Sequence, residues 1–159
     1  MDLGVFRDDF YNASAVLGSG QYKTSTQNGG TIAASLMAGA QENYLAFSGQ
    51  TTAQGLTTDT AANIIAQIQS AVNTALIASQ SGLGAAVVPP AGVPNLFNLS
   101  YFLQIVNNNT SVAVITLTGG TGVTISGTNT LAITTSRQFL VTITGPAAIT
   151  MQNVGSGTP

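Results

Sequence analysis

Residues 117–144 read LTGGTGVTISGTNTLAITTSRQFLVTIT, and this stretch decides the fold class. Apolar and small polar side chains alternate along residues 123–126 and 139–144, with the period of two that is typical of strands with one buried face. Short runs of Gly, Thr and Asn lie between these segments and are typical of turns. The same pattern extends in both directions, so we expect a series of strands over residues 99–154.

The expected strands are short and evenly spaced, which favours an antiparallel β-sandwich or barrel in the C-terminal half, over residues 99–159. Their apolar positions begin with Tyr101, Leu103 and Ile105, pass through residues 112–117 and end with Met151. The separating turns are expected at residues 107–111, 119–122, 127–129, 135–137 and 145–148. No internal repeat is evident. We therefore predict a mainly β protein.

Residues 59–80, DTAANIIAQIQSAVNTALIASQ, form the clearest helical segment of the chain. Apolar residues recur at helical spacing at positions 61, 64, 65, 68, 72, 75 and 76. We expect Thr58 or Thr60 to cap the N-terminus, where Asp59 also interacts favourably with the helix dipole. The other face of this amphipathic helix is polar but uncharged, which suits contact with another polar protein surface.

Residues 1–57 combine Gly, Ser and Thr with most of the aromatic residues and most of the charge. This composition predicts an irregular N-terminal arm with short strands and a helical turn near Ile32–Ala40. Two interpretations of its aromatic side chains stay open: they insert into a neighbouring protein, or they pack on the core of the same subunit. The Pro- and Gly-rich residues 83–98 form a connector, so the chain divides into regions 1–57, 58–98 and 99–159.

Charged residues make up only 5% of the chain, and the formal net charge is -2, whereas about 25% charged residues are typical of globular domains. After Asp59 the single charged residue is Arg137. The chain has 3 basic residues, too few for a surface that binds nucleic acid or an anionic membrane. Because charge is depleted at the centres of protein interfaces, we expect other subunits to cover much of the surface.

The Gly-rich residues 119–122 are expected to form a turn as part of a hairpin, because the Lys and the following helix of a phosphate-binding loop are both missing. The chain has no His and no Cys, which excludes a Ser-His-Asp triad and argues against a zinc site. Its few acidic residues match neither a calcium loop nor a glycosidase pair. We therefore expect no enzymatic activity, no metal, no cofactor and no small-molecule substrate.

The N-terminus lacks the basic start and the apolar run of a secretory signal. No stretch approaches the roughly 20 apolar residues of a membrane helix. We therefore expect a soluble protein that does not interact with a membrane.

Three segments resemble small virion proteins of tailed bacteriophages: DDFYNAS at residues 8–14, AGAQENY at 38–44 and TAANII at 60–65. The C-terminal run over residues 117–157 resembles the same group most closely. The family that this resemblance indicates is that of the capsid decoration, or cement, proteins. Proteins of this family lie on the outside of the head and brace the major capsid protein, often as trimers. The resemblance implies no catalytic residues.

The resemblance thus implies a structural virion protein, made in the host cytoplasm, that binds the exterior of the capsid and stabilises the shell of major capsid proteins. It also implies a homotrimer or another homo-oligomer. We expect the N-terminal arm to reach a neighbouring subunit or the shell. The candidate protein-interface residues are Phe6, Arg7, Asp8, Asp9, Phe10, Tyr11 and Tyr22. Arg7 is expected to pair with Asp8 or Asp9 or with charges of a neighbour, and a solvated charge cluster is the alternative.

The alternative function is a tail, neck or fibre β-module that binds another virion protein, a host receptor or a glycan. Glycan sites generally present exposed aromatic rings beside polar groups. The connector and the expected strands offer Phe97, Tyr101, Phe102 and Phe139 and no Trp, and most of these positions fit the pattern of core residues. The decoration protein is therefore the preferred hypothesis.

Overall fold

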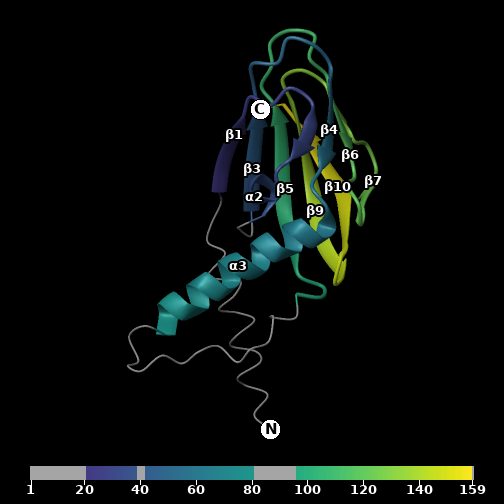
Figure 1. The fold of residues 1–159 in the computed structure, drawn as a ribbon. Helices are drawn as coiled ribbons and strands as arrows, with labels where there is room; N and C mark the ends of the chain where they lie inside the picture. Colours follow the sequence, from purple (N-terminus) through teal and green to yellow (C-terminus); the bar gives the residue numbers. More distant parts are fainter. Residues whose placement is uncertain (1–20, 39–41, 81–95, 159) are drawn as a thin grey trace.

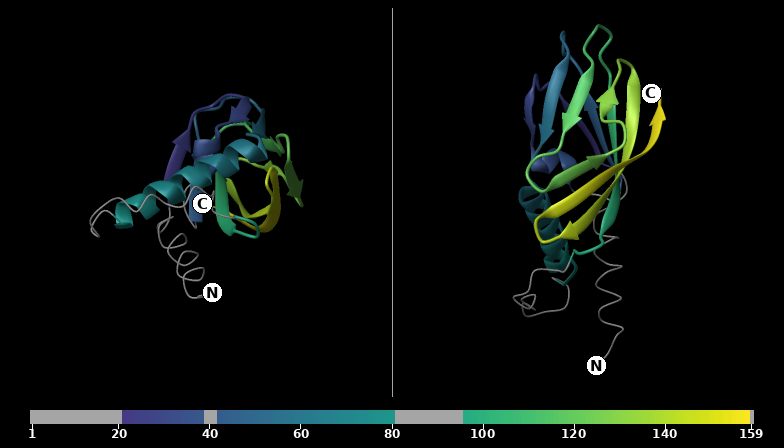
Figure 2. Two further views of the ribbon diagram at one scale, coloured as in Figure 1. Left: turned by 60° about the horizontal axis from the view of Figure 1, so that its bottom comes forward. Right: turned by 90° about the vertical axis from the view of Figure 1, so that its right-hand side faces the viewer.

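The structure is a computed structural model that describes residues 21–38, 42–80 and 96–158 (Figure 1). Within these ranges two β-sheets pack face to face, and a long helix crosses one end of the pair (Figures 1 and 2). Apolar side chains from both sheets fill the space between them. The described part of the chain is therefore a β-sandwich with one shared core.

The larger sheet has six strands and combines parallel with antiparallel pairs. From edge to edge it contains β1 (Gln21–Ser25), β3 (Glu42–Phe47), β5 (Ser100–Asn107), β9 (Thr135–Gly145), β10 (Ala148–Gly157) and β7 (Val123–Ser126). β1, β3 and β5 are parallel, whereas β9 is antiparallel to both β5 and β10. β7 lies parallel to β10 at the far edge.

The smaller sheet has four strands and repeats the same arrangement on a smaller scale. From edge to edge it contains β2 (Gly30–Ile32), β4 (Gln54–Thr58), β6 (Ile115–Thr118) and β8 (Thr130–Leu131). β2, β4 and β6 are parallel, and β8 is antiparallel to β6. Each sheet thus begins with parallel strands and gains antiparallel strands later in the chain.

From β1 to β6 the chain alternates between the two sheets, as in a β-solenoid. The first coil is β1 and β2, the second is β3 and β4, and the third is β5 and β6, with equivalent strands paired in parallel. A short helix, α2 (Ala34–Met37), lies between the first and second coils, and α3 (Ala61–Gln80) lies between the second and third. The parallel pairing follows because each strand re-enters its sheet in the same direction.

Amide side chains join the three coils at the turns that lead from the larger sheet to the smaller one. The Asn109 Nδ2 atom donates to Gln50 Oε1 at 2.7 Å, and the Gln50 Nε2 atom donates to the main-chain carbonyl oxygen of Gln27 at 2.8 Å. Asn107 is fully buried and donates to the Ala113 carbonyl oxygen at 2.7 Å. We call Gln27, Gln50, Asn107 and Asn109 the amide ladder. It satisfies polar groups that burial would otherwise deprive of water.

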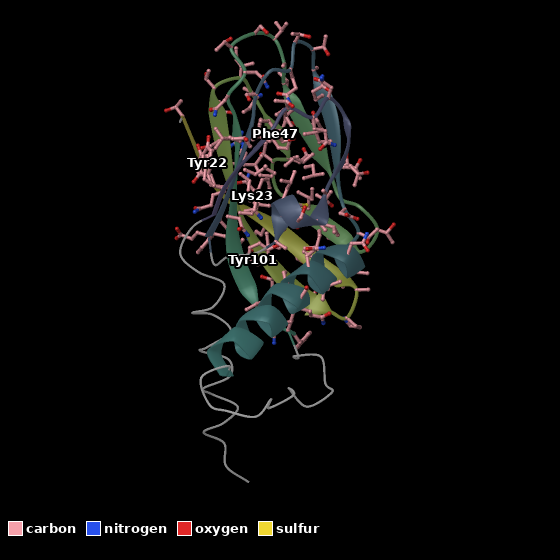
Figure 3. All side chains as sticks on the ribbon, turned by 60° about the vertical axis from the view of Figure 1, so that its left-hand side comes forward. Tyr22, Lys23, Phe47 and Tyr101 are labelled. Carbon is pink, nitrogen blue, oxygen red and sulfur yellow. The ribbon has the colours of Figure 1, made fainter. Side chains whose placement is uncertain are left out.

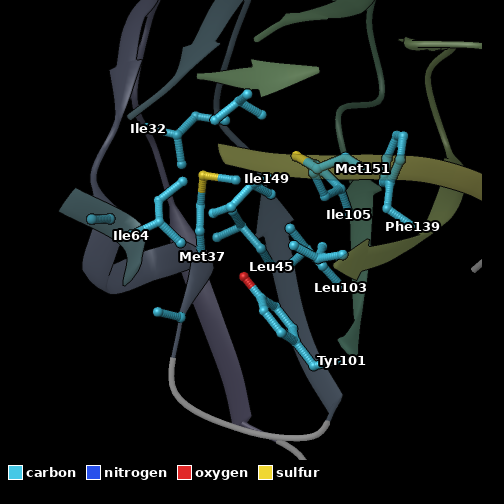
Figure 4. Packing of buried hydrophobic residues seen from close by; sticks show 14 of the residues in the cluster. Ile32, Met37, Leu45, Ile64, Tyr101, Leu103, Ile105, Phe139, Ile149 and Met151 are labelled. Atoms are coloured by element: carbon cyan, nitrogen blue, oxygen red, sulfur yellow. The ribbon is translucent and has the colours of Figure 1, made fainter. Parts of the chain in front are cut away.

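The core contains aliphatic side chains from both sheets and from α3, together with a few aromatic and Met side chains (Figure 4). Phe47 and Phe139 are among the largest side chains that are fully buried. Along β5, Tyr101, Leu103 and Ile105 point inward and are buried, as their spacing of two requires. Burial of each large aliphatic side chain stabilises the fold by about 1.5–3 kcal/mol.

Helix α3 covers one end of the sandwich with its first half and continues beyond it (Figure 2). Its buried residues are Ala61, Ile64, Ile65 and Ile68, whereas residues 62, 63, 66 and 67 are exposed. The predicted amphipathic helix is therefore confirmed over this half. The Asn63 N–H donates to Thr60 Oγ1 at 3.2 Å, so Thr60 and not Thr58 is the N-cap. The side chains of residues 72, 75 and 76 lie outside the described part.

The structure confirms the mainly β class and the sandwich, including antiparallel pairs in the C-terminal half. The sheets do not close into a barrel, because β1 and β7 remain as edges of one sheet and β2 and β8 as edges of the other. The parallel pairs and the repeated unit of strand, turn, strand and helix were not predicted. They arise from pairing between coils, which local sequence patterns do not report.

Three expectations for the C-terminal half require correction. Residues 112–114 are not part of a strand, because β6 begins at Ile115 and Val112 is 79% exposed. Residues 135–137, expected as a turn, pair with β5 as the start of β9. Residues 119–122 do form a turn, but it connects strands of different sheets and not a hairpin.

Residues 21–58 form the short strands β1 to β4 and the helical turn α2, which lies where a helical turn was predicted. These strands pair within both sheets, so this part of the chain belongs to the sandwich and is not an irregular arm. Phe47 packs in the shared core, whereas Tyr22 is 64% exposed. Residues 1–20 and most of the connector, residues 83–95, lie outside the described residues.

Candidate functional site

The Gly-rich turn at residues 119–122 lies against the N-terminus of α3. The Ala61 N–H donates to the Thr121 carbonyl oxygen at 2.9 Å, and the Gly120 N–H donates to Thr58 Oγ1 at 2.8 Å. A Cβ atom on Gly120 would collide with backbone carbonyl groups just before the helix. A phosphate bound at this helix end would need the Ala61 N–H, which already donates its hydrogen bond to the Thr121 carbonyl oxygen. This turn is therefore a structural cap for α3.

Asp59 links the N-termini of both helices. Its Oδ1 atom accepts hydrogen bonds from the Thr60 N–H at 2.7 Å and from Asn63 Nδ2 at 2.8 Å. Its Oδ2 atom accepts from the Ala34 N–H at 3.2 Å. The hydrogen bond from the Asn63 side chain is the main reason why the pKa of Asp59 lies below its usual value. The carboxylate is thus engaged in holding α2 and α3 together.

The basic side chains in the described part of the chain also bind backbone carbonyl oxygens. Lys23 Nζ donates to two carbonyl groups around α2, at 2.6 and 2.7 Å, and partial burial lowers the pKa of Lys23. Arg137 Nε donates to the Thr130 carbonyl oxygen at 3.3 Å. Glu42 is exposed, and its carboxylate accepts no hydrogen bond from the described residues. Among these charged groups, Glu42 alone makes no hydrogen bond with the described residues.

Cross-strand rows of mostly neutral side chains cover the outer face of the six-stranded sheet, which is the face turned away from the core. The first row is Tyr22, Tyr44, Gln104 and Gln138. The second row is Glu42, Phe102, Leu140 and Gln152. The third row is Ser100, Thr142, Thr150 and Thr124. Glu42 supplies the single charge in these three rows.

The first two rows form a pocket at the β1 side of the sheet. Tyr22 stacks on Tyr44 with ring centroids 4.8 Å apart and an interplanar angle of 21°. Figure 3 shows Tyr22 on the outer side of β1, whereas Phe47 lies between the sheets. The pocket has a volume of about 280 Å³. We call it the aromatic pocket, and its walls include Tyr22, Tyr44, Phe102, Glu42, Gln104 and Gln138.

The structure places one of the predicted interface residues in this pocket. Tyr22 is exposed on the edge strand β1, so no described residue blocks its contact with another molecule. The other candidates lie outside the described residues, namely Phe6, Arg7, Asp8, Asp9, Phe10 and Tyr11. Their predicted interface role therefore stays a prediction.

Sequence reasoning missed the rest of the aromatic pocket. Most of the four aromatic positions 97, 101, 102 and 139 were expected in the core, but Phe102 is 39% exposed and Phe97 is 54% exposed. Tyr101 and Phe139 are buried, as expected. The alternation along the first part of β5 contains the signal that was missed, because Phe102 and Gln104 occupy the positions that alternate with the inward residues Tyr101 and Leu103.

Among the described residues, no group of three or more His, Cys, Asp or Glu side chains is arranged to hold a metal ion. None of the described helices is both long and apolar enough to span a membrane. No family model, no curated protein and no solved structure matches this chain.

Proposed function

We propose that this protein is a non-enzymatic structural protein of a tailed-bacteriophage virion that binds the exterior of the capsid. In this role it contacts the major capsid protein and stabilises the shell, as a homotrimer or another homo-oligomer. The resemblance of several segments to capsid decoration proteins supports the proposal. The chemistry of the described surface supports it independently.

The observation that carries the proposal is the neutrality of that surface. The described part of the chain has only four charged side chains, and three of them, Lys23, Asp59 and Arg137, make hydrogen bonds within the sandwich, whereas the fourth, Glu42, is exposed. Burial of an unpaired charge at an interface is strongly unfavourable. A surface of Ser, Thr, Asn, Gln and aromatic residues avoids that penalty and suits repeated contact with other proteins.

Repetition adds to the effect of each contact. A stable protein interface generally buries about 800 Å² per partner. A shell presents the same binding site many times, and an oligomer engages several sites together, which raises the overall avidity. A modest binding free energy per subunit is therefore sufficient to stabilise the shell.

A reconstitution experiment tests the proposal. Purified protein is added to phage heads that lack it, and binding is measured by co-sedimentation and by electron microscopy of the heads. We expect saturable binding on the outside of the head and a higher temperature of head disruption. Absence of the protein from the heads of mature virions, or no binding to stripped heads, would contradict the proposal.

A truncation tests the predicted role of the N-terminal residues. Deletion of residues 1–20 spares β1, which begins at Gln21, so circular dichroism should still report a folded sandwich. We expect weaker binding to heads, by about tenfold or more if these residues supply main contacts.

Two substituted proteins show whether the aromatic or the acidic side chains of this segment supply the binding. One replaces Phe6, Phe10 and Tyr11 with Ala, and the other replaces Asp8 and Asp9 with Asn. Unchanged binding by the truncated protein would remove these residues from the interface.

A further inference from the structure

The aromatic pocket combines features that the shell-binding role does not require. Tyr22 and Phe102 expose large apolar rings on a sheet face, at 64% and 39% exposure. The Tyr22–Tyr44 stack holds two rings in a defined orientation before any ligand arrives. Preorganised rings lose little conformational entropy on binding, so they suit a small ligand with a flat apolar face.

Polar groups surround these rings and are free to bind a ligand. Within the described part of the chain, no hydrogen bond engages the side-chain amides of Gln104 and Gln138 or the carboxylate of Glu42. An amide both donates and accepts hydrogen bonds, whereas a carboxylate accepts them. The pocket therefore offers donors and acceptors close to apolar rings, as small-molecule sites generally do.

The charge of the pocket restricts the ligand. Its walls contain one carboxylate, Glu42, and no cationic side chain. Lys23 and Arg137 are engaged with carbonyl oxygens elsewhere in the sandwich. A phosphate, a nucleotide or an acidic sugar would meet repulsion without compensation. A neutral ligand that carries several hydroxyl groups fits best.

We propose that the aromatic pocket binds one residue of a neutral glycan. A pyranose ring has a face of C–H groups, which packs on Phe102 and the tyrosine pair, and hydroxyl groups, which bond to Gln104, Gln138 and Glu42. The volume of about 280 Å³ is at the lower limit for ligand pockets and fits one ring. A site this small and open binds weakly, so many copies on one particle would act together. This proposal does not depend on the capsid role.

The test uses the full chain labelled with ¹⁵N and the methyl glycosides of glucose, galactose, mannose and N-acetylglucosamine as probes. We expect at least one glycoside, at millimolar concentration, to shift the backbone resonances of Tyr44, Phe102 and Gln104. The substitution Phe102→Ala should weaken that binding by about tenfold or more. Phe97→Ala is the matched control, because it removes another exposed Phe outside the pocket and should leave binding unchanged.

Gln104→Met keeps the approximate size of the side chain and removes only the amide, so it tests the pocket without altering the sheet surface. We expect it to weaken binding as well. The proposal is overturned if no glycoside shifts these resonances, or if Phe102→Ala and Phe97→Ala bind equally well. Loss of head binding by Phe102→Ala, with no glycoside binding by the parent chain, would assign the pocket to a protein interface and leave the capsid role intact.

Discussion

Tyr101 is a buried residue whose polar group is not compensated by a hydrogen bond among the described residues. It is 4% exposed, its ring lies in the core beside Leu103 (Figure 4), and its hydroxyl has no hydrogen-bond partner among the described residues. A buried hydroxyl without a partner generally costs about 1–3 kcal/mol. We expect Tyr101→Phe to raise the free energy of unfolding by about 1 kcal/mol, measured by urea denaturation at an unchanged m-value.

The same residue predicts a response to alkaline pH. Burial raises the pKa of Tyr101. The unfolded chain ionises Tyr101 above pH about 10, whereas the folded chain keeps it neutral, so the free energy of unfolding falls as the pH rises above that value. Tyr101→Phe should show a smaller loss of stability above about pH 10 than the parent chain. If the substitution destabilises the protein at neutral pH, the hydroxyl has a partner and the interpretation is wrong.

Asp59 predicts a response to acid. Its pKa is lowered in the folded state, so it stabilises the fold above its unfolded pKa of about 3.9, and that contribution is lost as the pH falls through the folded value. We expect Asp59→Asn to lower stability at neutral pH by about 0.3–1 kcal/mol, the usual effect of a charge at a helix N-terminus. The difference between the two proteins should shrink in thermal unfolding near pH 2.

Glu42→Gln is the control for this experiment, because Glu42 is exposed and makes no hydrogen bond with the described residues. It should leave the acid response nearly unchanged. A difference between Asp59→Asn and the parent chain that stays constant with pH would mean that the geometry of the cap matters and its charge does not.

At the scale of elements, the amide ladder connects the turns of the three coils. Asn109 donates to both Gln50 and Asn107 and accepts from the Gln50 N–H at 2.9 Å. Asn109→Ala would leave Gln50 Oε1 and the Gln50 N–H without these partners, at about 1–3 kcal/mol each. We expect a loss of at least about 2 kcal/mol in chemical denaturation. Asn108→Ala, at the exposed neighbouring position, should change stability by less than about 0.5 kcal/mol.

The turn that caps α3 gives a second prediction at this scale. Gly120→Ala places a Cβ atom against backbone carbonyl groups, which cannot move as a side chain can, so we expect marked destabilisation. Gly55→Ala is the matched control, since a Cβ atom on Gly55 would meet no other atom within 4 Å and β4 should accept Ala without loss. Equal thermal stability of the two substituted proteins would show that the turn can shift away from α3.

Local patterns in the sequence predicted the elements better than their pairing. The alternation at residues 139–144 and the helical spacing at residues 61–68 depend on neighbours in the chain, and both elements are present. Tyr44, by contrast, pairs with Tyr22 on one side and with Gln104 on the other, and these partners are far apart in the sequence. Pairing over such separations depends on how the coils stack, which period and turn composition do not specify.

The aromatic pocket was only partly predictable for the same reason. Tyr22 was identified because an aromatic residue in a polar segment is conspicuous in the sequence. Phe102, Gln104 and Gln138 become one site only through the register of β3, β5 and β9. The outward direction of Phe102 was accessible from its alternation with Tyr101 and Leu103, whereas its position beside Tyr44 required the structure.

At the scale of the whole molecule, the scarcity of exposed charge predicts how association responds to salt. Raising the ionic strength from about 0.1 M to about 1 M shortens the Debye length from about 10 to about 3 Å, which weakens interfaces built on exposed charges. Contacts between neutral polar and apolar surfaces should hold or strengthen under the same change. We therefore expect the proposed homo-oligomer, measured by size exclusion with light scattering, to keep its mass and its dissociation constant over this range. Deletion of residues 1–20 removes Asp2, Arg7, Asp8 and Asp9, so it provides the control. Dissociation of the full chain at high salt, but not of the truncated chain, would place the decisive contacts in that charged segment and not on the neutral sandwich.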